Sequence, residues 1–78
     1  LKLPKGTIDK TITKTKEGFT IELSSDVLQK DIFLNTNTKG KFSDNYFDLL
    51  PKQKVIIEFQ TNAKSLDDLE IKSLNSIY

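Results

Sequence analysis

Residues 42–51 read Phe42-Ser43-Asp44-Asn45-Tyr46-Phe47-Asp48-Leu49-Leu50-Pro51 and hold three of the chain's seven aromatic residues. Polar turn-forming residues come first, and an alternating segment follows in which Phe47 and Leu49 share one side. Pro51 has no N–H to give to a neighbouring strand, so it marks a strand end. The pattern predicts a turn and then a strand that anchors itself in a core by its aromatic residues. A ligand platform is the alternative use of the same cluster.

Length and composition limit what the rest of the chain can do. A domain of 78 residues buries only about 60–65% of its unfolded surface, so a deep active-site cleft is not expected. The twelve basic residues are all Lys and leave a net charge of +1. Without Arg or a strong positive field, nucleic acid is not an expected partner.

The residue types that are absent narrow the chemistry further. The chain has no Cys and no His, which excludes disulfides and thiol chemistry and removes the commonest general base and metal ligand. We therefore expect no cofactor. No apolar run approaches the roughly 20 residues that span a bilayer, so no membrane span is expected.

The beginning of the chain predicts a linker rather than a folded segment. Pro4 and Gly6 interrupt any regular pattern within residues 1–6, and the domain is expected over residues 7–78. The chain also contains no Met, which indicates a processed or excised piece of a longer polypeptide.

Working outward from residues 42–51, period-two alternation predicts short strands throughout. They are expected over residues 7–16, 19–24, 27–36, 46–50, 55–60 and 69–74. The first is Lys-rich and Thr-rich, which is typical of an edge strand, and the Glu17-Gly18 turn joins it to the second as a hairpin. In the third strand, Leu28, Ile32 and Leu34 are expected on one side.

Two further features complete this interpretation. The strongest strand, 55–60, places Val55, Ile57 and Phe59 inward and leaves the apolar Ile56 outward. Ser65 with Asp68 three positions later predicts one helical turn. The whole pattern predicts an all-β fold, an immunoglobulin-like antiparallel β-sandwich of about six to seven short strands. A five- or six-stranded barrel is the alternative.

Residues 42–51 also carry a resemblance to a known family. They resemble the corresponding stretch in the C-terminal immunoglobulin-like domain of β-mannosidases, multidomain enzymes of glycoside hydrolase family 2. The alternating strand in 19–31, with its Ser-Asp and Lys-Asp pairs, and the ending 69–78 with its closing Tyr are similar to the same domain. The likeness covers residues 17–78, with a departure at Pro51-Lys52-Gln53, where Gly-Glu is more typical after Pro.

The resemblance implies a noncatalytic accessory domain that packs against other domains of the same polypeptide. Members of the family are retaining β-mannosidases whose two catalytic glutamates lie on a separate (β/α)8 barrel, and no position here corresponds to either. The glutamates of this chain are expected on the solvated surface, and they are Glu17, Glu22, Glu58 and Glu70. The resemblance also favours a bacterial periplasmic or extracellular location, although the sequence itself leaves localisation unknown.

Three residues are candidates for contact with a neighbouring domain or a sugar: Tyr46, Phe47 and Ile56. Core packing is nevertheless the expected role of Phe42 and Phe47, because burying a Phe contributes about 1.5–3 kcal/mol. Tyr46 is the member expected to be partly exposed. The oxygens of Asp44, Asn45 and Asp48 are an alternative set of calcium ligands, but their spacing is not that of a calcium loop, and turn formation is expected instead.

Two other functions fit the same residues and stay open at this point. A carbohydrate-binding module would stack Tyr46 on a sugar ring. A cell-surface adhesion or stalk module would use the same fold in tandem copies. Neither requires a catalytic residue.

Overall fold

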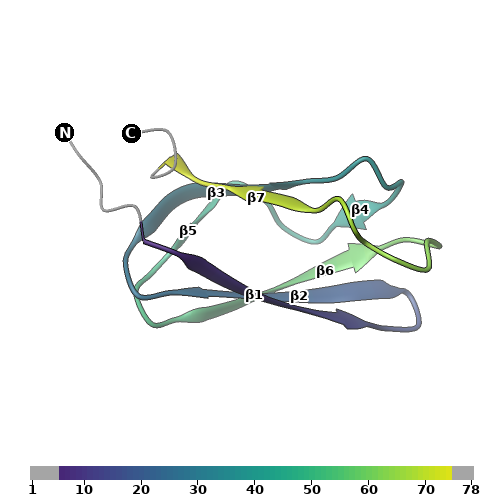
Figure 1. The fold of residues 1–78 in the computed structure, drawn as a ribbon, viewed down its shortest axis with the longest axis horizontal. Helices are drawn as coiled ribbons and strands as arrows, with labels where there is room; N and C mark the ends of the chain where they lie inside the picture. The colour runs from purple at the N-terminus through teal and green to yellow at the C-terminus, as the bar shows by residue number, and fades with distance from the viewer. Residues whose placement is uncertain (1–5, 75–78) are drawn as a thin grey trace.

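The structure is a computed structural model that describes residues 6–74. Seven strands in this range form two antiparallel sheets, one of four strands in the order β1-β2-β6-β4 and one of three in the order β5-β3-β7 (Figure 1). The strands are β1 Ile8–Lys14, β2 Gly18–Ser25, β3 Gln29–Asn35, β4 Lys41–Phe42, β5 Phe47–Leu49, β6 Lys54–Gln60 and β7 Glu70–Lys72. This arrangement confirms the predicted all-β sandwich rather than a barrel.

The hydrophobic core lies between the two sheets. Alternation along β2 and β6 places every second side chain in it, as predicted, and Leu49 of β5 is fully buried there. The core residues are Phe19, Ile21, Leu23, Ile32, Leu34, Leu49, Ile57, Phe59, Leu66 and Leu69. Period-two sequence patterns thus place the apolar face of each sheet toward the other.

Strand β1 lies at the edge of the four-stranded sheet and pairs with β2 as a hairpin, which confirms both predictions. Its exposed Lys and Thr residues protect an unpaired edge from association with another molecule. Strand β6 is central, between β2 and β4. Its inward residues are Val55, Ile57 and Phe59, and Ile56 is outward and 59% exposed, also as predicted.

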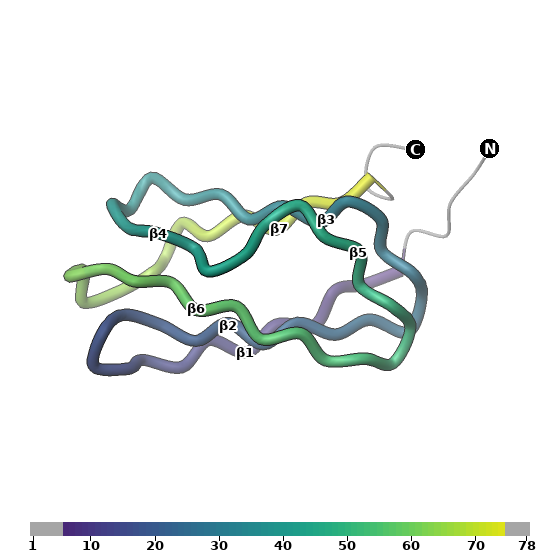
Figure 2. Tube along the Cα trace, turned by 180° about the vertical axis from the view of Figure 1, so that it is seen from behind, coloured from purple at the N-terminus to yellow at the C-terminus, as the bar shows by residue number. Residues whose placement is uncertain are grey.

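The stretch 42–51 connects the two sheets. Lys41 and Phe42 form the short strand β4, which pairs with β6, whereas Phe47 begins β5, which pairs with β3 (Figure 2). None of the strands predicted from the sequence includes residues 41–42, so β4 was missed. A strand of two residues is too short for periodicity to reveal. The Phe42 ring packs on Phe59 with a centroid distance of 4.5 Å, which fixes this end of the crossing in the core.

In the third strand, predicted over 27–36 and observed over Gln29–Asn35, the inward residue near the start is off by one position. Between the pairs Gln29–Leu49 and Ile32–Phe47, two residues of β3 lie opposite one residue of β5, so β3 contains a β-bulge. Asp31 has φ +50° at this point. The extra residue reverses the alternation, and Gln29 is therefore buried instead of Leu28. Bulges cannot be read from a hydrophobic pattern alone.

The predicted helical turn at Ser65 is also wrong. Residues 61–69 form an irregular connection in which Leu66 and Leu69 are buried. Asp68 does not bind the N-terminus of a helix but accepts hydrogen bonds from the loop between β3 and β4. Its donors are Thr36 Oγ1, Asn37 N at 2.8 Å and Thr38 Oγ1 at 3.3 Å. Asp68 therefore binds a loop that is distant in sequence, and not the backbone of its own segment as predicted.

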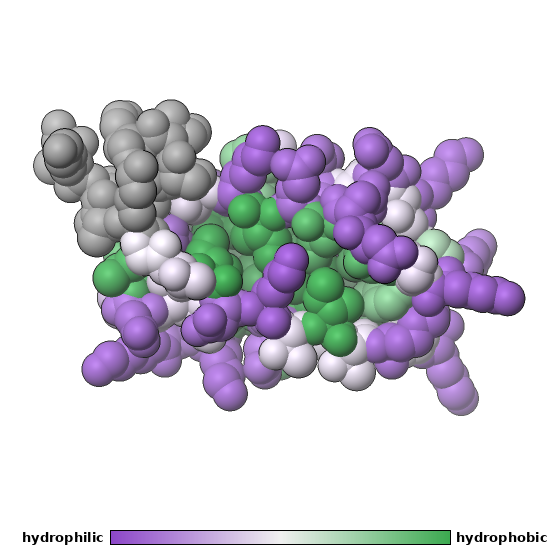
Figure 3. All heavy atoms as spheres, viewed as in Figure 1, coloured by the Kyte–Doolittle hydropathy of each residue, from purple (hydrophilic) through white to green (hydrophobic). Residues whose placement is uncertain are grey.

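A buried polar chain ties the sheets together near the ends of the described segment. Ser73 Oγ donates to Gln29 Oε1 at 2.8 Å, and Gln29 Nε2 donates to Ser25 Oγ at 3.3 Å. Pairing satisfies these polar groups in the core. Figure 3 shows, on this side of the molecule, apolar side chains that reach the surface between β1 and β7. Of the predicted linker 1–6, the structure describes only Gly6. Residues 75–78 of the predicted domain lie outside the described range as well.

Candidate contact surface on strand β5

Asn45 holds the segment before β5 in place through its side chain. Its Oδ1 accepts a hydrogen bond from Leu34 N at 2.8 Å, and its Nδ2 donates to Leu34 O at 3.1 Å. The amide thus occupies both backbone groups of one β3 residue, as a strand partner would. Asn45 Oδ1 also accepts from Tyr46 N at 3.1 Å, and Asp44 Oδ1 accepts from Asn45 N at 2.8 Å. These bonds are the turn chemistry that the sequence predicted.

Tyr46 is presented outward by this turn. Its side chain is 75% exposed, and its backbone has φ +56° in the left-handed region. The ring stacks on Phe33 of β3, with centroids 5.9 Å apart and an interplanar angle of 20°. Phe33 faces outward because its neighbours Ile32 and Leu34 are both in the core. The exposure predicted for Tyr46 is confirmed, and its ring lies on a second aromatic side chain.

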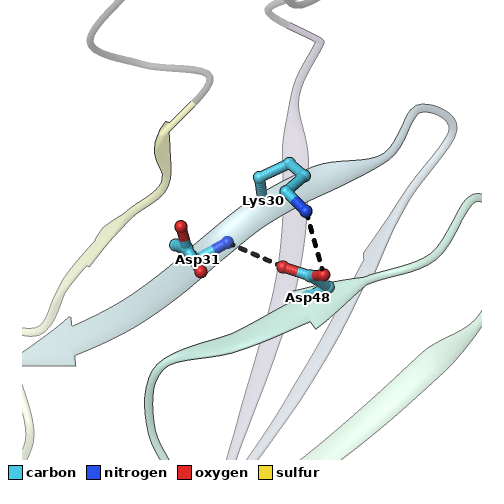
Figure 4. Close-up of polar contacts among 3 residues, drawn as sticks. All are labelled: Lys30, Asp31 and Asp48. Carbon is cyan, nitrogen blue, oxygen red and sulfur yellow. Dashed lines mark hydrogen bonds and ion pairs between the residues drawn. The ribbon is translucent and has the colours of Figure 1, made fainter.

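Asp48 lies next along the outward side of β5, between the inward residues Phe47 and Leu49. Its Oδ1 accepts from Asp31 N at 3.0 Å, and its Oδ2 lies 3.4 Å from Lys30 Nζ in an ion pair (Figure 4). The hydrogen bond from the Asp31 backbone, followed by the bond and charge of Lys30, lowers the pKa of Asp48 despite some loss of solvation. The bulge in β3 supplies the N–H that this carboxylate binds.

We call the outward side of β5 with its two neighbours on β3 the β5 face. It consists of Tyr46, Asp48 and Leu50 together with Phe33 and Lys30. Leu50 follows the buried Leu49 and is 48% exposed. The face therefore has an aromatic pair at one end, an ion pair in the middle and an aliphatic side chain at the other end.

The other two candidate contact residues do not join this face. Phe47 is partly buried and packs against the core. Ile56 lies on the opposite sheet, where it faces outward beside Glu22 of β2. The structure therefore separates Tyr46 from Ile56 by the thickness of the sandwich.

Comparison with known protein families agrees with this architecture. The sequence model of the Ig_mannosidase family, described as an Ig-fold domain, matches residues 3–77. The chain belongs to this family. No curated protein matches the chain with significance.

The four glutamates of this Ig_mannosidase domain lie on its surface or are half-buried. Glu17 and Glu58 line one hollow of about 210 Å³ on the four-stranded sheet, and both are exposed. Retaining hydrolysis needs two carboxyls about 5–5.5 Å apart around a sugar, with water excluded. An open hollow between two solvated side chains offers no such exclusion.

Metal binding and membrane spanning are the two other properties to compare with the described part of the Ig_mannosidase domain. Within residues 6–74, no group of three or more side chains of the usual metal-binding types gathers in one place. Asn45 and Asp48, which the sequence offered as oxygen ligands, hold backbone groups of β3 instead. The same range contains no helix long and apolar enough to cross a membrane.

The sequence did not select Phe33, Lys30 and Leu50 of the β5 face, nor Asp31, whose backbone N–H binds Asp48. Phe33 had a visible signal, because it is the apolar member of the polar side of its strand. For Lys30 and Asp31 the sequence carried no such signal. Their role depends on the bulge, which sets Asp31 N toward Asp48.

Proposed function

We propose that this domain is a noncatalytic accessory domain of a multidomain glycoside hydrolase of the β-mannosidase type. It packs against other domains of the same polypeptide and stabilises their arrangement. Residues 1–6 join it to the rest of the chain, and residues 7–78 form the domain. Membership of the Ig_mannosidase family over residues 3–77 is the observation that carries this proposal.

The chemistry of the described surface supports a noncatalytic role. The two carboxylates with a lowered pKa, Asp48 and Asp68, are held by backbone and hydroxyl donors that belong to the fold. A general acid needs the opposite change, a raised pKa that keeps its proton near neutral pH. As the resemblance to β-mannosidases implies, we assign catalysis in the parent enzyme to two glutamates on a separate barrel domain.

The test is hydrolysis of an aryl β-mannoside by the purified 78-residue chain and by the full polypeptide that contains it. We expect turnover by the full polypeptide only. Deleting the domain is expected to lower the unfolding temperature of what is left. Turnover by the 78 residues that persists after removal of contaminants would contradict the noncatalytic role, and a full polypeptide without a barrel domain would contradict the assignment to this enzyme class.

A carbohydrate-binding module is the second candidate, and the exposure of Tyr46 on Phe33 favours it. An aromatic face suits the apolar side of a pyranose ring, and neighbouring carboxylates accept hydrogen bonds from hydroxyls. Titration with mannose and manno-oligosaccharides, followed by amide NMR shifts, distinguishes the two functions. A saturable response around Tyr46 supports sugar binding, and its absence supports the accessory role.

A further inference from the structure

Folding does not require a tyrosine at position 46. The side chain is 75% exposed, so it gains little from burial. Its φ of +56° is unfavourable for a bulky residue, whereas Gly adopts it freely and Asn tolerates it. A substitution to Asn would remove both disadvantages. Within the described fold the Tyr46 ring contacts Phe33 and otherwise faces solvent, so most of its surface is left for a contact with another molecule or domain.

Tyr46 contributes a large, fixed contact surface. Stacking on Phe33 and the hydrogen bond from its N–H to Asn45 hold the ring and the backbone in one orientation. Tyr is enriched among the residues that dominate the energy of protein interfaces, and an immobilised side chain loses little entropy when it binds. The ion pair of Lys30 and Asp48 beside the rings provides the polar surround that such interfaces have.

Two exposed apolar side chains lie on this side of β5. The large apolar residues exposed within the described range are Tyr46, Leu50 and Ile56. Two of them belong to the β5 face, at its opposite ends. Single exposed apolar residues are common on monomers, but Tyr46 combines exposure with a positive φ and a fixed aromatic partner, which distinguishes it from Leu50 and Ile56.

The position of the described chain ends supports a covalently joined occupant. Gly6 and Leu74, where the described chain begins and ends, lie at the same end of the sandwich as the connection between β5 and β6, which starts at Leu50 (Figures 1 and 2). Lys52 in that connection donates its N–H to Ser25 O at 2.7 Å, and Ser25 pairs with Ile8 near the start of the chain. A domain joined at either end is held next to the β5 face at high effective concentration.

We propose that the β5 face is the surface through which this domain docks onto a neighbouring domain of the same polypeptide, with Tyr46 as its anchor. The inference rests on the proposed accessory function. The occupant presents an apolar pocket for the Tyr46 ring and a polar rim opposite Lys30 and Asp48. A tether makes such a small face sufficient, whereas a free second copy would need about 800 Å² on each partner.

Calorimetry of the 78-residue chain and of the full polypeptide tests the proposal. Docking is expected to raise the unfolding temperature of this domain in the full polypeptide above that of the isolated chain. Tyr46→Asn should abolish most of that difference while leaving the isolated chain equally stable or more stable. Thr11→Ala, at an exposed position of β1 on the opposite sheet, is the control and should leave the difference unchanged.

The outcomes separate the two proposals. If the wild-type domain unfolds at the same temperature alone and in the full polypeptide, the accessory function itself fails. If the difference exists and survives Tyr46→Asn, the domain packs through another surface and the present inference is overturned. If manno-oligosaccharides bind the isolated chain saturably at Tyr46 and Phe33, the β5 face is a sugar site and the docking proposal is also overturned.

Discussion

The side chain of Asn45 pairs with the backbone of Leu34 through two hydrogen bonds, to the N–H at 2.8 Å and to the C=O at 3.1 Å. Asn45 lies where the chain passes from β4 in one sheet to β5 in the other. The chain forms no regular strand pairing during this crossing. The side-chain amide of Asn45 therefore satisfies the backbone N–H and C=O of Leu34, on a part of the β3 edge that β5 does not cover. The same bonds determine where Tyr46 emerges.

Removing this amide should destabilise the domain. We expect Asn45→Ala to lower the free energy of unfolding by about 2 kcal/mol, since each lost hydrogen bond contributes about 1 kcal/mol. Urea unfolding at neutral pH measures the change. Asn62→Ala, at an exposed loop position, is the control and should change the value by less than about 0.5 kcal/mol. Equal values for the two variants would show that the pairing is not energetically important.

Acid should weaken the contacts of two aspartates. Asp68 has its pKa lowered from the ordinary 3.8 by the hydrogen bond from Thr36 and then by that from Asn37 N. Asp48 has its pKa lowered chiefly by Asp31 N. A depressed pKa in the folded state means that the stabilisation is complete above about pH 4 and is lost as pH falls through the folded-state value.

Asp68→Asn should therefore flatten the loss of stability below pH 4 and lower the urea midpoint at pH 7. Asp67→Asn is the matched control, since Asp67 makes no hydrogen bond with any residue of the range 6–74 and is exposed. Urea midpoints between pH 2.5 and 7 measure both variants. A pH profile of Asp68→Asn that parallels the wild type would contradict the proposed linkage.

Adjacent leucines should differ sharply in their contribution to stability. Leu49 is fully buried between the sheets, whereas Leu50 is 48% exposed. Leu49→Ala is expected to cost about 2–5 kcal/mol in unfolding free energy because it leaves a cavity. Leu50→Ala should cost less than about 1 kcal/mol in the isolated chain. Chemical denaturation of both variants checks the pair, and a reversed order would mean that β5 is packed the other way round.

Gly18 should not tolerate a side chain. It has φ +151°, and a Cβ there would lie 1.9 Å from the backbone oxygen of Phe59. Since backbone rather than a flexible side chain blocks the space, Gly18→Ala is expected to cost more than about 2 kcal/mol. Thermal unfolding followed by circular dichroism measures this loss. An unchanged transition would show that the hairpin and β6 separate easily at this point.

Much of the fold follows from the local pattern of the sequence. Alternation in β2 and β6 specified which residues are inward, because successive side chains of a strand point to opposite faces. The Lys-rich composition of β1 indicated an edge, and Pro51 indicated where β5 stops. For the contact surface, the sequence selected Tyr46 and its exposure but not its partner.

The remaining features depend on register between distant segments. The sequence could not show that Phe33 lies under Tyr46, since the bulge at Asp31 determines which residues of β3 and β5 lie opposite each other. It also misassigned Asp68, which had a plausible local role at a helix start but binds residues about 30 positions away.

The sequence by itself determined the all-β class, six of the seven strands and the inward faces of β2 and β6, because these depend on a two-residue period within each segment. Only the tertiary structure decided that residues 42–51 join two sheets, that Asn45 pairs with Leu34, and that Tyr46 and Ile56 lie on opposite faces. Those relationships arise when strands choose partners, and hydrogen bonds between segments far apart in the chain leave no local pattern to read.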